Sequence, residues 1–240
     1  MPEQPEISIL VAAFNEEENM EACIRSIATA MPDSEIVIVH GGTDATLDVA
    51  RSLQSEFPQI IPIYNENDRG KGHAIKAGAA RARGNIIAQF DADLQFAAKD
   101  LPALTAPIRE GLCDVTLGSR FTVDADCAAY QPSFFRDIGN RLLCIYVSCL
   151  CGRKTTDVTA GIKAWTRSAF EQIDFRDDAY SYEAEIVIRA HRLGLRVEEI
   201  PVTYASRTMG ASMHADNLQV IRAGLTILLK SLNFRFGTYK

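Results

Sequence analysis

Two carboxylates stand one residue apart directly after an apolar segment. Asp91 and Asp93 follow residues 85–90, which read as a buried strand. Side chains two residues apart in an extended chain point to the same face, so both carboxylates can converge just past the strand end. In open α/β sheets, ligands bind at that edge. Two acids at one point repel each other unless a cation lies between them, and their oxygen atoms suit Mg²⁺ or Mn²⁺. The alternative is a solvated acidic loop in which Asp93 caps the next helix.

Strands and helices alternate four times in the part of the chain that must position these acids. We expect strands over 7–14, 35–39, 60–64 and 85–90. We expect helices over 19–30, 46–57 and 71–83. This alternation favours a parallel sheet with helices on both faces.

The second half of the chain mixes the two element types without strict alternation. Helical patterns cover 98–110, 134–150, 181–193 and 217–232, and strand patterns cover 114–119, 161–165 and 197–204. We therefore predict a single α/β domain with a mostly parallel central sheet and helices on both faces. Its expected parts are a nucleotide-binding half (1–96), an acceptor half (97–216) and a C-terminal helical tail (217–240).

Composition and charge narrow the function classes. The 240 residues are 47% apolar and 23% charged, as in soluble globular proteins. A net charge of −6 argues against a nucleic-acid binder. No signal peptide precedes the six cysteines, so we expect a reduced, cytoplasmic chain, and the cysteine and histidine spacing does not suit zinc. No apolar run reaches the roughly 18 residues that span a bilayer.

Two familiar phosphate-binding loops are absent from the sequence. The first strand leads into Ala-Ala-Phe-Asn-Glu (12–16), which is not the G-x-G-x-x-G loop of dinucleotide-binding folds. Residues 69–73, Arg-Gly-Lys-Gly-His, lack the spacing of a P-loop. What remains is a fold that holds a diphosphate through a metal on acidic residues. That is the chemistry of nucleotide-sugar transferases, in which the metal neutralises charge on the departing diphosphate.

Seven short segments carry a resemblance to one known family. Residues 90–95, Phe-Asp-Ala-Asp-Leu-Gln, include a D-A-D-L-Q metal motif residue for residue. The other six segments are 11–16, 38–46, 69–75, 118–121, 157–161 and 182–185. In this order they resemble glycosyltransferase family 2, in particular the dolichyl-phosphate mannose synthase and polyprenyl-phosphate glycosyltransferase type, over nearly the whole chain. The resemblance implies a GT-A-type domain, an inverting hexosyltransferase that uses a UDP- or GDP-sugar, and Mg²⁺ or Mn²⁺ as cofactor.

The resemblance also implies a set of site residues. Asp91, Asp93 and Gln95 would hold the metal and, through it, the diphosphate. Arg120 would neutralise phosphate oxygens, a role suited to guanidinium, and Asp157 would orient other groups. The catalytic set is Asp91, Asp93, Arg120, Asp157 and Glu185. The donor-binding set is Ala12, Phe14, Glu16, His40, Gly41, Lys71, Asp91 and Arg136.

Two departures from the family leave the donor base and the acceptor open. His40 stands where the family usually has an aspartate, and a neutral imidazole accepts a hydrogen bond from a base N–H only in one tautomer. In the late acceptor loop Met213 replaces a lysine that helps to hold an acceptor phosphate, while Arg207 and Ser212 remain as the acceptor-binding pair. A polyprenyl phosphate is the favoured acceptor, and a saccharide or small-molecule hydroxyl is the alternative. The Gly-Lys-Gly loop (70–72) resembles the glucosyl branch of the family more than the mannosyl branch, which slightly favours UDP as the donor nucleotide.

The acceptor decides whether the enzyme needs a base. A lipid phosphate is already ionised near neutral pH, whereas a hydroxyl requires a carboxylate that takes its proton. Glu183 and Glu185, two residues apart on a helix, do not share a face, so at most one would face the site. Glu185 is the preferred candidate.

The tail carries an apolar stripe at helical spacing, made of Leu218, Ile221, Leu225, Leu228, Leu229 and Leu232. With Arg222 and Lys230 nearby, such a stripe fits a helix that lies on a membrane surface beside a lipid acceptor. A core position or a homodimer contact is the more usual role and is the favoured prediction. Peripheral contact with the inner face of the membrane is the alternative.

Two other functions compete with glycosyl transfer. A nucleotidyltransferase would share the alternating elements and the acidic metal ligands, but it normally opens with a glycine-rich, basic loop after the first strand. A non-catalytic sugar-nucleotide binder is the second, because His40 and Met213 depart from the family pattern.

Overall fold

The structure is a computed structural model that describes residues 4–130, 134–207 and 217–237. Within these residues the strands are β1 (Ile7–Ala13), β2 (Glu35–His40), β3 (Ile60–Tyr64), β4 (Ile86–Asp91), β5 (Val115–Ser119), β6 (Lys163–Thr166) and β7 (Val197–Pro201). The α-helices are α1 (Glu17–Ala30), α2 (Thr46–Ser52), α3 (Lys71–Ala79), α4 (Leu101–Arg109), α5 (Phe134–Cys151), α6 (Arg167–Ile173), α7 (Tyr182–Arg192) and α8 (Asn217–Phe236). Short 3₁₀ turns, η1 (Leu53–Ser55) and η2 (Ala98–Asp100), follow α2 and precede α4.

The strands form one sheet in the order β3-β2-β1-β4-β6-β5-β7. Neighbouring strands run parallel except at β6, which is antiparallel to both β4 and β5. The predicted α/β class and mostly parallel sheet are therefore confirmed. The reversed strand β6 lies inside the sheet, between β4 and β5.

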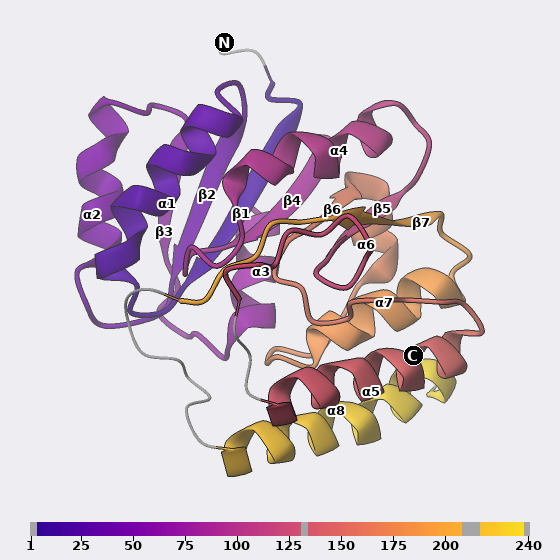
Figure 1. Cartoon of the computed structure of the whole chain (residues 1–240). Helices are drawn as coiled ribbons and strands as arrows, with labels where there is room; N and C mark the ends of the chain where they lie inside the picture. The colour runs from indigo at the N-terminus through magenta and orange to yellow at the C-terminus, as the bar shows by residue number, and fades with distance from the viewer. Residues whose placement is uncertain (1–3, 131–133, 208–216, 238–240) are drawn as a thin grey trace.

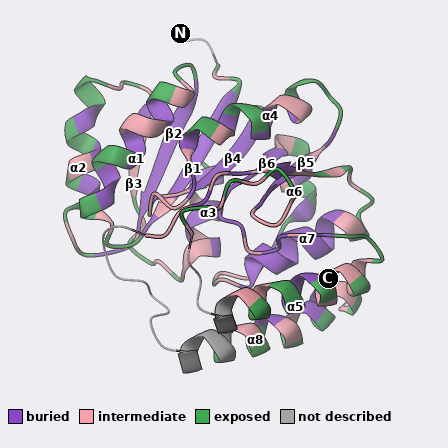
Figure 2. Ribbon diagram, viewed as in Figure 1, coloured by how far each residue is buried: buried purple, intermediate pink, exposed green. Residues whose placement is uncertain are grey.

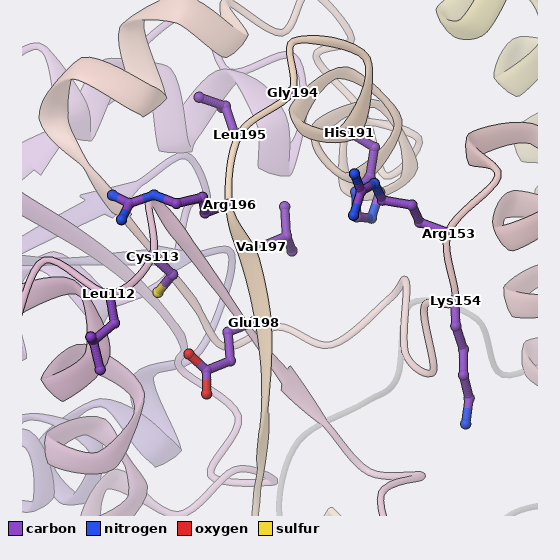
Figure 3. A pocket seen from close by; sticks show the side chains of 10 residues that line it. All are labelled: Leu112, Cys113, Arg153, Lys154, His191, Gly194, Leu195, Arg196, Val197 and Glu198. Atoms are coloured by element: carbon purple, nitrogen blue, oxygen red, sulfur yellow. The ribbon is translucent and has the colours of Figure 1, made fainter.

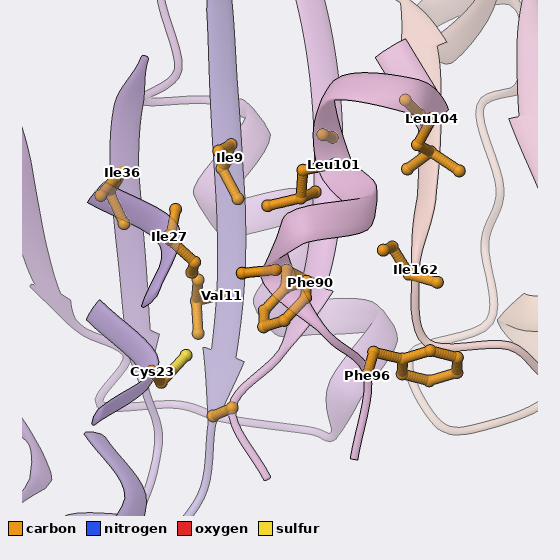
Figure 4. Close-up of a cluster of buried hydrophobic side chains, with 14 of the residues drawn as sticks. Ile9, Val11, Cys23, Ile27, Ile36, Phe90, Phe96, Leu101, Leu104 and Ile162 are labelled. Atoms are coloured by element: carbon orange, nitrogen blue, oxygen red, sulfur yellow. The ribbon is translucent and has the colours of Figure 1, made fainter. Parts of the chain in front are cut away.

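Two apolar cores fill the space on either side of the sheet, because successive strand residues point to opposite faces. Ile9 and Val11 of β1 pack with α1 and α4 on one face, and Leu10 packs with α3 and α7 on the other. Figure 4 shows the first core, where Phe90 of β4 lies among the side chains of the covering helices. Phe90 is fully buried next to Asp91, so the strand that carries the acids is anchored in the core.

Helices α5 and α8 form an outer layer that packs against α7 (Figure 1). The Tyr146 hydroxyl of α5 donates to the Leu228 carbonyl of α8 at 3.0 Å, and Leu143, Val147 and Ile227 are buried on the inner side. Figure 2 shows exposed residues along both helices. None of the helices in the described part of the chain combines the length and the apolar content that a membrane crossing requires.

The favoured prediction for the apolar stripe of the tail was a core position or a homodimer contact, and the structure corrects the first of these, while the homodimer contact stays a prediction. Leu225, Leu229 and Leu232 are exposed, with Leu229 at 72%, and Leu228 is only partly buried. The side chains of Leu218 and Ile221 lie outside the described residues. The stripe is exposed because α8 turns its buried residues, such as Ile227 and Phe234, toward the rest of the fold.

Some element boundaries also differ from the sequence patterns, and one helix was not predicted. The apolar run over 161–165 forms a strand only from Lys163, and the run over 197–204 ends as a strand at Pro201. Helix α6 was not predicted, because its seven residues are too few for a clear apolar period. Its start is marked by Thr166, whose hydroxyl oxygen accepts from the Ala169 N–H at 3.0 Å, which is an N-cap signal in the sequence.

Candidate active site

The carboxyl ends of β1, β2 and β4 lie side by side. Ala12 of β1 is paired with Asp91 of β4, and Ala13 is paired with His40 of β2. The chain moves outward from β1 to β2 and β3 on one side and continues through β4 on the other, so the sheet has a topological switch point between β1 and β4. Ligands of open α/β sheets bind in the crevice at such a point. Phe14, just beyond β1, is half exposed at this edge.

Asp91 forms an ion pair with Lys71 at the start of α3. The Lys71 ammonium lies 2.7 Å from Oδ1 and 3.0 Å from Oδ2 of the carboxylate. Burial raises the pKa of Asp91 to about 6, Lys71 opposes this rise and Asp93 adds to it. Gly161 backs the same carboxylate so closely that a Cβ there would lie 1.8 Å from Oδ2. Asp91 is therefore held between a cation and a position that only glycine fits.

Asp93 and Gln95 are placed by a tight turn after β4. The Asp93 Oδ1 accepts from the backbone N–H of Gln95 at 3.2 Å, and Leu94 between them has a left-handed φ of 59°. A residue with a Cβ adopts this conformation only when its surroundings hold it there. The pKa of Asp93 is raised, chiefly by burial. Gln95 donates through Nε2 to the Ala205 carbonyl at 3.2 Å, and this bond does not use the Oε1 atom of the same amide.

The oxygen donors at this turn fit a hard divalent ion. Asp91 and Asp93 supply carboxylates and Gln95 supplies an amide oxygen, and Lys71 already places a positive charge on Asp91. In the described part of the chain no group of three or more His, Cys, Asp or Glu side chains forms a complete metal site. Mg²⁺ is usually held by one or two carboxylates together with substrate phosphates, so a partial protein site suits a metal that arrives with a diphosphate.

A second lysine lies behind Lys71. Glu183 of α7 accepts from Lys71 at 3.1 Å and from the fully buried ammonium of Lys163 on β6. Gln89 of β4 donates to the same carboxylate at 3.3 Å, and the Tyr182 hydroxyl donates to Gln89 at 3.0 Å. Burial alone would raise the pKa of Glu183, but Lys163 and Lys71 outweigh it and lower the pKa to about 2.

The structure corrects the preference for Glu185 as the carboxylate that faces the site. Its carboxylate is fully buried and accepts from the backbone N–H groups of Arg176 and Asp177 at 3.0 and 2.8 Å. Glu185 therefore fastens the loop before α7, while Glu183 points toward Lys71 and Asp91. The two glutamates are two residues apart, about half a helical turn, so they point to different sides of α7, in agreement with the expectation that at most one of them faces the site.

Arg120 and Asp157 form a buried, two-point ion pair. Nε and Nη2 of Arg120 donate to the two oxygens of Asp157 at 2.7 and 2.8 Å, and Asp157 is fully buried. The guanidinium lies over the Tyr204 ring, 4.9 Å from its centroid. Asp157, predicted as an orienting group, thus sets the direction of Arg120.

Glu16 and Arg207 join the predicted donor and acceptor groups. Nη2 of Arg207 lies 2.6 Å from both carboxylate oxygens of Glu16, and Nη1 lies 3.9 Å from Asp93 Oδ2. The segment that follows Arg207 contains Ser212 and Met213, which lie outside the described residues. Arg207 therefore sits between the acid turn and the start of the predicted acceptor loop.

The predicted base-binding residues line the end of β2. His40 is 2% exposed, its Nε2 lies 3.8 Å from Asp44, and its Nδ1 has no hydrogen-bond partner in the part of the chain that the structure describes. Gly41 lies so close to Asp68 that a Cβ there would be 2.5 Å from that side chain. Arg136 belongs to α5, but its side chain is outside the described residues.

Sequence reasoning missed Lys163 and Gly161 as parts of the site. Lys163 is a single charged residue in the run Ile162-Lys163-Ala164-Trp165, and an isolated charge inside a buried strand signals a paired or functional group. Gly161 was noted only as part of a motif, and nothing in the sequence shows that it backs Asp91.

Comparison with known proteins identifies the family. Residues 8–174 match the family model described as Glycosyl transferase family 2. The chain belongs to glycosyltransferase family 2. The chain is 26% identical over 241 residues to an undecaprenyl-phosphate mannosyltransferase of Micrococcus luteus, covering 95% of this chain and 98% of the relative. It is 27% identical over 220 residues to a polyprenol monophosphomannose synthase of Mycolicibacterium smegmatis, covering 88% and 82%.

Other relatives of this glycosyltransferase are longer. The low-salt glycan biosynthesis hexosyltransferase Agl6 of Haloferax volcanii is 27% identical over 215 residues, and the match spans 88% of this chain but 50% of Agl6. Among solved structures, glucosyl-3-phosphoglycerate synthase of Mycobacterium tuberculosis, crystallised with Mn²⁺, UDP-glucose and phosphoglyceric acid, aligns with a TM-score of 0.72. That alignment has 20% identity and covers 98% of this chain and 81% of the other. The glycosyltransferase therefore shares the GT-A-type fold.

Proposed function

We propose that this glycosyltransferase transfers a hexose, with inversion, from a UDP- or GDP-sugar to the phosphate of a polyprenyl lipid, with Mg²⁺ or Mn²⁺ bound at Asp91, Asp93 and Gln95. The observation that carries the proposal is that Glu183 and Asp157, two carboxylates outside the proposed metal ligands, are each held by a cation. Glu183 is held by two lysines, and Asp157 is held by Arg120.

A hydroxyl acceptor would need a carboxylate that takes its proton. Glu183, with a pKa of about 2, is a weak base. Both carboxylate oxygens of Glu16 accept from Nη2 of Arg207. Glu185 is turned into the protein and bonded to backbone N–H groups. A phosphate acceptor is already ionised and needs no base, so it suits these carboxylates better than a hydroxyl does.

The cations of the site suit a reaction between two phosphate-bearing substrates. When bound, the metal would neutralise charge on the departing diphosphate. Arg120 is pre-oriented by Asp157, so it loses little side-chain freedom when it meets a phosphate oxygen. Arg207, the first residue of the predicted acceptor loop, supplies a second guanidinium beside Asp93. We assign Arg120 to the diphosphate and Arg207 to the acceptor phosphate.

The outer layer offers a surface for the lipid. Exposed apolar residues recur at helical spacing on α5 (Ile138, Leu142, Ile145) and on α8 (Leu225, Leu229, Leu232, Phe236). We call these seven residues the outer apolar face. Exposed apolar patches of monomers are usually small, and an amphipathic helix pair with basic residues such as Arg222 beside it suits the surface of a bilayer. The names of the Micrococcus and Mycolicibacterium relatives refer to undecaprenyl phosphate and a polyprenol, which also favours a lipid acceptor.

The acceptor is tested with a matched pair of lipids. Undecaprenyl phosphate and undecaprenol, each with UDP- and GDP-sugars and with Mn²⁺ or EDTA, differ only in the phosphate. We expect metal-dependent transfer to the phosphate and none to the alcohol. Comparable transfer to undecaprenol or to a saccharide hydroxyl would disprove the lipid-phosphate assignment. Retention of the anomeric configuration would disprove inversion.

The outer apolar face is tested with Leu142→Glu and Leu229→Glu. Both variants should lose binding to phospholipid vesicles, while the exposed Leu193→Glu, outside this face, should keep it. Donor affinity should be unchanged in all three. A shift in molecular mass in solution, with vesicle binding intact, would instead assign the face to a homodimer contact.

A further inference from the structure

A cleft of about 630 Å³ lies at the end of β5 and β7 that is remote from Arg120. Cys113, just before β5, lines it, whereas Arg120 follows the other end of the same strand. Figure 3 shows the strand that begins at Val197 crossing the cleft, with Arg153 and Lys154 on one side of it. A volume of this size suits a small molecule. Nothing in the proposed transfer reaction uses this cleft.

Four charged side chains of the described residues line the cleft: the cations Arg153, Lys154 and Arg196, and the carboxylate of Glu198. Arg153 and Lys154 are exposed, and neither forms an ion pair with any side chain in the described ranges 4–130, 134–207 and 217–237. The third cation, Arg196, is occupied: it donates to Asp114 at 2.7 Å and to the Gly111 carbonyl at 2.7 Å. Arg153 and Lys154 are neighbours in the sequence, and with only Glu198 as an unpaired carboxylate among the described residues of the lining they leave an excess of positive charge that attracts an anion.

His191 provides a polar wall next to Arg153. Its Nε2 lies 3.2 Å from the Thr155 hydroxyl, and its buried Nδ1 has no partner among the described residues. Burial and Arg153 lower the pKa of His191, so the ring is neutral near pH 7. The positive charge of the cleft therefore comes from Arg153 and Lys154.

The backbone limits what can bind. β7 is the last strand of the sheet, and an edge strand leaves part of its N–H and C=O groups unpaired. At Glu199 the chain of residues 156–157 lies against β7, because the Glu199 carboxylate accepts from the backbone N–H groups of Thr156 and Asp157 at 2.6 and 3.2 Å. The open stretch is too short for an added peptide strand, which favours a compact ligand.

We propose that Arg153 and Lys154, with the open start of β7, form a binding site for a phosphate group, carried by a small organic phosphate or by a lipid headgroup. The two cations bind the phosphoryl oxygens, since charge-assisted hydrogen bonds to phosphate are the strong ones. Leu195 and Val197 provide an apolar wall for the organic part of the ligand.

The proposed site is connected to the transferase site through a short stretch of chain. Lys154 is followed closely by Thr156 and Asp157, which Glu199 of β7 clamps. Asp157 in turn orients Arg120. A phosphate bound between 153–154 and β7 tightens the two segments that hold Asp157, so we expect it to slow the exchange of the Thr156 and Asp157 amide hydrogens.

The site is tested by titrating the full chain, without metal or donor, with glycerol 3-phosphate and with pyrophosphate. Two double variants are compared: Arg153→Ala/Lys154→Ala, and Arg81→Ala/Lys99→Ala as the control, which removes two exposed cations elsewhere. We expect the first to weaken binding by about tenfold or more and the control to leave it unchanged. Hydrogen exchange should slow at 153–157 and 195–198.

A parallel titration separates the two sources of the phosphate. Vesicles of phosphatidylcholine with and without phosphatidylglycerol are offered to the same proteins. Weaker binding of the first variant to the anionic vesicles alone assigns a lipid headgroup, and weaker binding to glycerol 3-phosphate assigns a free organic phosphate. Equal binding of both double variants to every probe, or protection only around Asp91, would overturn the proposal. All readouts are binding measurements, so failure of the proposed transfer reaction would not affect them.

Discussion

Lys71 and Asp91 form an ion pair at the carboxyl end of β4, with the ammonium within 3.0 Å of both carboxylate oxygens. Lys71 also holds Glu183 at 3.1 Å, so it has a second acid to which it can turn when a metal takes Asp91. The pKa of Lys71 is raised well above its usual range: burial would lower it, but Asp91 and Glu183 outweigh the burial. The ammonium therefore stays charged and balances the acids when no metal is bound.

Replacing Lys71 by methionine should destabilise the metal-free protein. Loss of the cation leaves Asp91 and Glu183 with less compensation, at a cost of about 2 kcal/mol. Mn²⁺ restores the charge, so it should raise the melting temperature more in Lys71→Met than in wild type, while donor affinity falls about tenfold. Thermal unfolding with and without Mn²⁺ measures the first effect and calorimetry with UDP the second. Lys99→Met is the control, and equal melting temperatures for the two variants would contradict the role of Lys71.

Asp157→Asn should reduce turnover more than it changes donor affinity. The amide cannot balance the buried guanidinium of Arg120, so we expect a loss of about 3 kcal/mol in the free energy of unfolding. Misorientation of Arg120 should lower kcat by about tenfold or more. Urea unfolding and steady-state kinetics provide the two measurements. Asp114→Asn removes the carboxylate of the similar but exposed pair with Arg196 and should change kcat little. A kcat equal to wild type in Asp157→Asn would show that the orientation of Arg120 does not matter for the reaction.

The pH dependence of stability should contain a contribution from Glu183. Its pKa is lowered from 4.5 to about 2 in the folded protein, so the unfolded chain binds the proton more readily. The stabilisation is complete above pH 4.5 and is lost as the pH falls from there toward 2, and it amounts to about 3 kcal/mol. Glu183→Gln should therefore be less stable than wild type at neutral pH, and the difference should shrink on acidification. Urea unfolding at several pH values tests this, with the exposed Glu171→Gln as control. A constant difference between Glu183→Gln and wild type would contradict it.

Gly161→Ala should damage the metal site. The added Cβ would lie 1.8 Å from Asp91 Oδ2, so the carboxylate must move. We expect Mn²⁺-dependent UDP binding to weaken by about tenfold or more, because small displacements of a ligand group are costly. Gly139→Ala, in α5 with open space around it, should keep binding and gain roughly 1 kcal/mol of stability. Unaltered UDP binding in Gly161→Ala would show that the Asp91 position is not needed.

The sequence by itself determined the first four strands, the position of the paired acids and the family. The alternating apolar runs predicted β1 to β4 within about two residues, and the D-x-D spacing predicted that Asp91 and Asp93 meet beyond β4, because period and spacing are local properties of the chain. The seven segments in order also predicted the family, which the family model confirms.

Only the tertiary structure decided how the charges pair. It turned Glu183 rather than Glu185 toward Asp91, placed Lys163 of the reversed strand behind Glu183, and brought Arg207 to Glu16 across 191 positions of the chain. It also exposed Leu225, Leu229 and Leu232 of the α8 stripe, for which a core position or a homodimer contact had been predicted. These outcomes depend on which helix packs on which strand and with which face. Such long-range packing is set by the whole core, so no local period in the sequence encodes it.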